Sequence, residues 1–126
     1  MNYTIPTAAL KKHNIVVSGT SSTKMNYLDM NEPDPTTRTF ELGSSNVPTS
    51  MEYSPDLDLL FIGTKSSNIL VLSFKAQDFK IVHVLSGHHE DLISSVVYLS
   101  SCKLLFSSSY DGNIASWLYD QDSSTF

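Results

Sequence analysis

The sequence is poor in cysteine, in charge and in long apolar runs. Of its 126 residues, one is cysteine and 17% are charged. A single cysteine forms no intrachain disulfide, which excludes a disulfide-stapled domain and fits a reducing compartment. No apolar run approaches the roughly 18–20 residues of a spanning helix, which excludes a helical membrane protein. The net charge of −5 argues against broad binding to nucleic-acid phosphates, which needs clustered Lys and Arg.

Two further shortages bear on location and partners. Residues 1–6 lack the basic stretch and the long apolar core of a signal peptide, so we expect an intracellular protein, cytoplasmic or nuclear. The charged fraction of 17% lies below the roughly 25% of an average globular chain. With so little solubilising charge, part of the surface is expected to be covered by other protein.

What the sequence does contain is an internal repeat of about 44 residues. Each repeat has an apolar stretch that ends in small polar residues, and a second apolar strand follows. Gly19 precedes Gly63 by 44 residues, and Gly63 precedes Ser108 by 45. The three apolar stretches begin at Ile15, Leu59 and Leu104, and the strands after them cover 25–28, 69–72 and 114–117.

Further short strands complete the repeat. They are predicted upstream of each hairpin at 5–7, 47–49 and 94–98, and downstream of the first two at 37–42 and 80–85. No window keeps a helical apolar period, so we expect almost no helix. Four strands in about 44 residues match the size of one β-propeller blade. An antiparallel sandwich also has strands at short spacing, but it does not explain the constant offset.

The third repeat resembles the WD40-repeat (G-protein-β-like) family. It opens with Gly87-His88, and its third strand ends at Trp117, although the Asp that follows Trp in the family is replaced by Leu118. Between them, Asp111-Gly112 is a strong hairpin signal. The resemblance implies an all-β fold of about three four-stranded antiparallel WD40-type β-propeller blades, an incomplete propeller. The expected blades cover 1–43, 44–86 and 87–126, and the last lacks a full outer strand.

In this family, a loop His, a strand Ser or Thr, a turn Asp and a strand Trp form a buried hydrogen-bonded chain. The resemblance therefore implies a structural blade network at His89, Ser107, Asp111 and Trp117. Ser109 is the alternative to Ser107, because both share one strand face. His88 is the alternative to His89: His88 completes the Gly-His dipeptide, whereas His89 has the usual spacing to the following strand, and we favour His89.

The first two repeats match the family pattern more weakly. Leu28 and Leu72 stand where the family has Trp, and Ser22 and Ser66 stand where it has the turn Asp. We expect these two units to be held together by apolar packing instead.

The resemblance implies a non-catalytic protein–protein interaction scaffold, or a subunit of a larger assembly. One rim would be formed by the central hairpin turns and the loops that enter each blade. Lys65, Glu90 and Tyr110 on this rim are the candidate partner contacts. Closed propellers have roughly 4–8 blades, so three blades predict a protein partner or self-association that covers the exposed faces. We expect no cofactor, no metal and no small-molecule substrate.

Two other interpretations stay open. The first is a small metal-dependent hydrolase that uses the cluster His88-His89-Glu90-Asp91 together with Cys102. Adjacent side chains of an extended segment point to opposite faces, which disfavours convergence on one ion and favours a structural loop. The second is a truncated WD40 paralogue without independent function.

Overall fold

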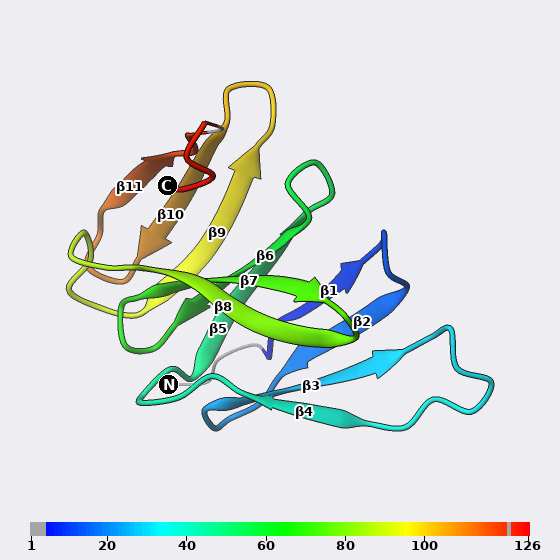
Figure 1. Cartoon of the computed structure of the whole chain (residues 1–126). Coiled ribbons are helices and arrows are strands. Elements are labelled where there is room, and N and C mark those ends of the chain that lie inside the picture. The colour runs from blue at the N-terminus through cyan, green and yellow to red at the C-terminus, as the bar shows by residue number, and fades with distance from the viewer. Residues whose placement is uncertain (1–4, 121) are drawn as a thin grey trace.

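The computed structural model describes residues 5–120 and 122–126, which form three antiparallel β-sheets (Figure 1). Sheet 1 contains β1 (Thr7–Leu10), β2 (Ile15–Gly19), β3 (Lys24–Asp29) and β4 (Arg38–Glu41). Sheet 2 contains β5 (Pro48–Ser54), β6 (Leu59–Thr64), β7 (Ile69–Lys75) and β8 (Asp78–Leu85). Sheet 3 contains β9 (Ile93–Leu99), β10 (Leu104–Ser109) and β11 (Ile114–Leu118).

The predicted all-β class is confirmed: every regular element of the described residues is a strand. In this part of the chain there is also no helix of the length and apolarity that crossing a membrane requires. The strands of each sheet follow one another in sequence order, so every connection is a short hairpin or loop between neighbours. Such order is typical of sheets built from one repeating unit.

The sequence repeat reappears as a repeated register between the second and third strand of each sheet. Val16 pairs with Leu28 in sheet 1, Leu60 pairs with Leu72 in sheet 2, and Leu105 pairs with Trp117 in sheet 3. These pairs are separated by the same offsets of 44 and 45 residues as the sequence motifs. The three hairpins are therefore structurally equivalent, and each residue has a counterpart in the next sheet.

Sheet 2 lies in the middle, and its two faces pack on different neighbours (Figure 1). Because side chains alternate along a strand, Leu70 and Leu72 face sheet 1 while Ile69 and Val71 face sheet 3. The core toward sheet 1 includes Leu10, Ile15, Val17, Met25, Leu60 and Ile62. The core toward sheet 3 includes Phe61, Leu85, Ile93, Val96 and Leu105. Burial on both faces explains why β6 and β7 are almost continuously apolar.

The first strand lies later in the chain than predicted. The sequence pattern indicated a strand at 5–7, but β1 covers Thr7–Leu10. Leu10 pairs with Ile15 across the β1–β2 turn, and both side chains are 1% exposed. Burial of this pair decides the position of the strand, whereas Pro6 has no backbone N–H to donate to a ladder.

Candidate functional site

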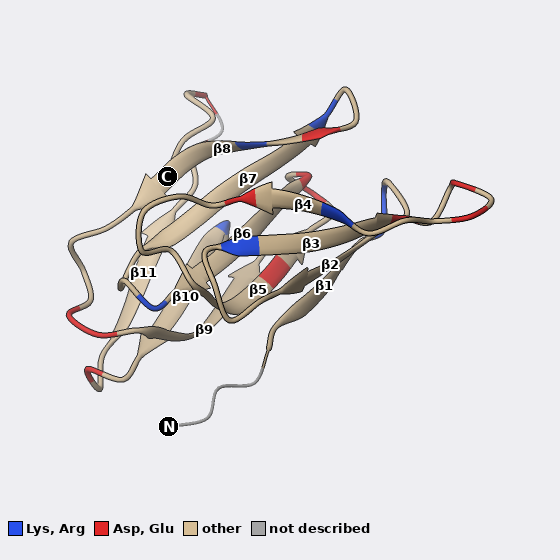
Figure 2. Ribbon diagram, turned by 90° about the horizontal axis from the view of Figure 1, so that it is seen from below, with Lys and Arg blue, Asp and Glu red and all other residues tan. Residues whose placement is uncertain are grey.

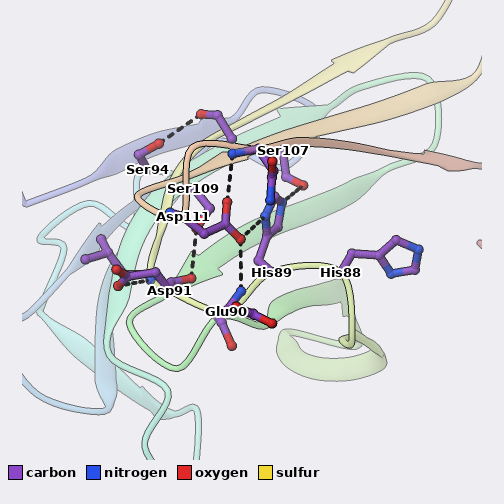
Figure 3. Close-up of polar contacts among 12 residues, drawn as sticks. His88, His89, Glu90, Asp91, Ser94, Ser107, Ser109 and Asp111 are labelled. Atoms are coloured by element: carbon purple, nitrogen blue, oxygen red, sulfur yellow. Dashed lines mark hydrogen bonds and ion pairs between the residues drawn. The ribbon is translucent and has the colours of Figure 1, made fainter.

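The four residues of the expected blade network lie together at one end of sheet 3. Figure 3 shows His89, Ser107 and Asp111 side by side there. His89 comes from the loop before β9, Ser107 from β10, Asp111 from the β10–β11 turn and Trp117 from β11. His89 Nε2 is 2.8 Å from Ser107 Oγ, and His89 Nδ1 is 3.1 Å from Asp111 Oδ2. Trp117 Nε1 donates to Ser107 Oγ at 3.3 Å.

The chemistry of these groups gives the hydrogen-bond chain one direction. Trp117 Nε1 is only a donor, so Ser107 Oγ accepts from it and directs its own proton to His89 Nε2. An ionised Asp111 only accepts, so His89 carries a proton on Nδ1 and donates it to the carboxylate. In this neutral tautomer each ring nitrogen of His89 has its partner, although the residue is only 6% exposed.

The structure separates the two alternatives that the sequence left open. The His88 ring points away from the chain of hydrogen bonds (Figure 3). It packs on the Trp117 ring, with 4.1 Å between the ring centroids. Ser109 bonds elsewhere: its Oγ donates to the Asp91 carbonyl at 3.0 Å and accepts from the Asp111 backbone N–H at 3.1 Å. Ser109 therefore supports the loop and turn around the network rather than its centre.

Asp111 also connects two surface segments. Its carboxylate accepts from the backbone N–H of Glu90 at 2.9 Å and from that of Asn113 at 2.8 Å, in addition to His89. The hydrogen bond from the Glu90 backbone holds the pKa of Asp111 below its ordinary value; desolvation opposes this, and Asn113 and His89 reinforce it. The loop that carries Glu90 is thus fixed to the turn that carries Tyr110.

The three candidate partner contacts, Lys65, Glu90 and Tyr110, are exposed and lie at the same end of sheets 2 and 3. Tyr110 keeps 49% of its surface exposed. Its backbone N–H donates to the Leu92 carbonyl at 3.1 Å, and the Lys65 backbone N–H donates to the Val47 carbonyl at 2.8 Å in the equivalent position of sheet 2. Thr49 Oγ1 donates to the Ile93 carbonyl, which places the starts of β5 and β9 beside each other.

A smaller polar network, which the sequence analysis missed, occupies the same end of sheet 2. Thr64 Oγ1 and Ser66 Oγ are 3.0 Å apart, and Ser66 Oγ donates to Asn46 Oδ1 at 2.8 Å. Asn46 in turn donates from Nδ2 to the Leu42 carbonyl at 3.3 Å and is 9% exposed. Apolar packing is therefore not the whole explanation for this sheet. The sequence did hold a signal for this network: Ser66 stands 45 residues before Asp111, at the equivalent position of the repeat.

The arrangement does not assemble the residues of the hydrolase interpretation. Cys102 lies in the β9–β10 turn, whereas His89 lies before β9. The seven residues of β9 separate them by about 20 Å at the rise of an extended strand. Within residues 5–120 and 122–126, no three His, Cys, Asp or Glu side chains gather as a metal site requires.

Comparison with known proteins gives one sequence match and several structural ones. Residues 79–117 match the family described as WD domain, G-beta repeat (WD40). This range runs from β8 to β11, without the first residue of β8 and the last of β11, and contains the whole hydrogen-bond chain around His89. No curated protein matches the chain by sequence.

Solved WD40 structures share the fold at low sequence identity. The WD40 β-propeller domain of Doa1 superposes with a TM-score of 0.73 at 17% identity, over 93% of this chain and 38% of that one. U3-55K superposes with a TM-score of 0.75 at 18% identity, over 99% of this chain and 38% of that one. A chain of a mitotic checkpoint complex has a TM-score of 0.75 at 15% identity, over 92% and 36%.

The chain thus spans little more than a third of the length of these structures, and it corresponds to about three of their blades. WD40 propellers commonly mediate protein–protein interactions or scaffold assemblies, and they are generally non-catalytic. With the repeated sheets, the shared register and the hydrogen-bond chain of sheet 3, these matches identify the chain as an arc of WD40-type β-propeller blades.

Proposed function

We propose that the chain is a non-catalytic protein–protein interaction scaffold that contacts its partner through Lys65, Glu90 and Tyr110. We also propose that its blades cover 1–43, 44–86 and 87–126, and that it acts inside the cell, in the cytoplasm or the nucleus, without a cofactor. The observation that carries the proposal is the role of Asp111, which ties the Glu90 loop to the Tyr110 turn.

This connection matters because a rigid contact surface binds with a smaller loss of conformational freedom. Tyr110 supplies a half-exposed aromatic ring, the residue type that most often dominates protein interfaces. Lys65 and Glu90 add charges of opposite sign on the same rim, which favours a partner surface that is polar at its edge and apolar at its centre.

The test compares rim variants in quantitative affinity capture. Proteins that bind the wild-type chain should be lost with Tyr110→Ala and reduced with Glu90→Lys and Lys65→Glu. A Tyr contact at the centre of an interface is worth about 2 kcal/mol, roughly a 30-fold loss of affinity. Lys80→Glu on β8, away from the rim, is the matched control and should retain the partners.

Two results would contradict the proposal. One is a partner set that the rim variants and the Lys80→Glu control retain equally. The other is a partner lost with Tyr110→Ala only because the variant unfolds, which unfolding curves of both proteins would reveal.

A further inference from the structure

The outer edge of sheet 3 differs from the outer edges of sheets 1 and 2. The edge strands β4 and β8 carry charged residues, which are Arg38, Glu41, Asp78 and Lys80 (Figure 2). The ladder between β7 and β8 also contains a register shift. Charges and bulges on an edge strand hinder pairing with another chain. Both edges are therefore protected in the way that natural sheets usually are.

β11 has none of these protections. Its sequence, Ile-Ala-Ser-Trp-Leu, contains no charge and no proline, and its ladder with β10 runs without a register shift. Among the described residues, β10 is the one strand that pairs with it. The backbone groups on its other side are thus available to a further strand.

β11 also exposes apolar side chains whose counterparts are covered in the other sheets. Ile114 is 76% exposed, whereas its counterparts Ile69 and Met25 are 1% and 0% exposed. Leu118 is 64% exposed, on the same face of the strand two pleats further along. These are the two most exposed large apolar side chains of the described residues, and they border one unprotected edge.

We propose that β11 pairs with β11 of a second copy of this chain, antiparallel, about a two-fold axis at Ser116. In this register Ser116 faces its own copy, Ile114 faces Leu118, and Ala115 faces Trp117. Ile114 and Leu118 thus meet on one face of the joined sheet, and on the other face the small Ala115 meets the large Trp117. No charge opposes a like charge. The strand is therefore complementary to itself, as a symmetric two-fold contact requires.

A second copy stacking face to face with sheet 1 fits less well. The side of sheet 1 that points away from sheet 2 carries Ser18 and Asn26, where sheet 2 has Ile62 and Leu70. Stacking would bury the exposed Val16 on that side, but it would also remove Ser18 and Asn26 from water. Edge pairing leaves them exposed and joins the two three-stranded sheets into one continuous sheet of six strands.

The contact is small, since each copy contributes a strand of five residues. Interfaces of this size belong to the weak and transient class. We expect sedimentation to show a monomer at micromolar concentration, with a mass that rises from 14.0 kDa toward twice that value as concentration approaches millimolar.

A charge-exchange experiment tests the register. Ser116→Lys places two like charges opposite each other, so the dissociation constant should rise about tenfold or more, and Ser116→Glu should act in the same way. An equimolar mixture of the two variants should associate again. Val84→Lys is the control: Val84 is a 54% exposed apolar residue on β8, and its replacement should leave association unchanged. Ser116 is exposed, so both variants should unfold like the wild type.

A crosslink provides a second measurement. Residues directly opposite in an antiparallel pair have Cα atoms about 4.5–5.5 Å apart, within the range of a disulfide. In a Cys102→Ser background, mild oxidation should convert Ser116→Cys into a covalent dimer, and Val84→Cys should stay monomeric. Three results would overturn the proposal: a wild type that is monomeric at every concentration, a mixture that fails to reassociate, or crosslinking that is equal at both positions. None of them bears on the Tyr110 rim.

Discussion

His13 Nε2 lies 2.9 Å from one carboxylate oxygen of Asp58 and 3.0 Å from the other, and so joins sheet 1 to sheet 2. His13 belongs to the β1–β2 turn and Asp58 to the β5–β6 turn. Tyr53 donates to the same carboxylate at 2.7 Å, and the His13 ring packs edge-on against Phe74 with 5.2 Å between the ring centroids. A polar contact thus reinforces the apolar seam between the two sheets.

We expect His13→Ala to lower the free energy of unfolding by about 1 kcal/mol, because the side chains are only partly buried. A double-mutant cycle with Asp58→Ala isolates the pair. The coupling should be about 0.5–1 kcal/mol in urea-unfolding measurements. Strictly additive effects of the two substitutions would show that the contact contributes nothing to the seam.

The contribution of Asp58 should depend on pH. Desolvation raises the pKa of Asp58, but hydrogen bonds from Tyr53 and His13 and the charges of His13 and Lys12 lower it more, so it lies below its ordinary value of 3.8. Because the folded pKa is depressed, this stabilisation is present above that value and is lost as pH falls through the folded pKa.

The measurement is the difference in unfolding free energy between the wild type and Asp58→Asn across a pH series. We expect the difference measured at about pH 5 to shrink steadily below about pH 4. A difference that does not shrink at any pH between about 5 and the lowest pH at which both proteins stay folded would contradict the assignment.

Ser107 Oγ lies at the centre of the hydrogen-bond chain in sheet 3, where it is both a donor and an acceptor. Ser107→Ala leaves Trp117 Nε1 and His89 Nε2 without their partner in a site where Ser107 is 2% exposed. We expect a loss of about 1–3 kcal/mol in unfolding free energy. The neighbouring Ser108→Ala is the control and should change stability by less than about 0.5 kcal/mol, since its bond to Ser94 is exposed. Equal effects would argue against a structural role for the chain.

Gly63, on β6 of sheet 2, lies against Ile93 of sheet 3. A Cβ atom there would lie 2.3 Å from Ser50 Oγ and 2.5 Å from Ile93 Cγ2. Gly63→Ala should therefore destabilise the protein by about 1–3 kcal/mol, as overpacking does. Gly19, its counterpart in sheet 1, would meet proline ring atoms at 2.9 Å or more, so Gly19→Ala should be milder. Thermal unfolding of both variants checks the order.

Much of the local structure was predictable because it depends on short-range chemistry. Alternating apolar residues and the Asp111-Gly112 turn predicted strands and hairpins, and the offsets of 44 and 45 residues predicted that the three units are alike. The predicted position of the first strand was wrong, because the position of β1 depends on the burial of Leu10 opposite Ile15 rather than on the local pattern. The role of Asn46 was missed for a similar reason: its partner Ser66 is 20 residues away.

The scarcity of charge and of cysteine, the strand pattern and the repeat were determined by the sequence alone, since each is a property of neighbouring residues. The tertiary structure decided which faces pack together and which polar groups meet. It turned His89 toward Ser107 and left the adjacent His88 on Trp117, because successive side chains point in different directions. It also determined that Ile114 is exposed while Ile69, with the same local pattern, is buried: exposure depends on the sheet that covers a strand, which no local stretch of sequence specifies.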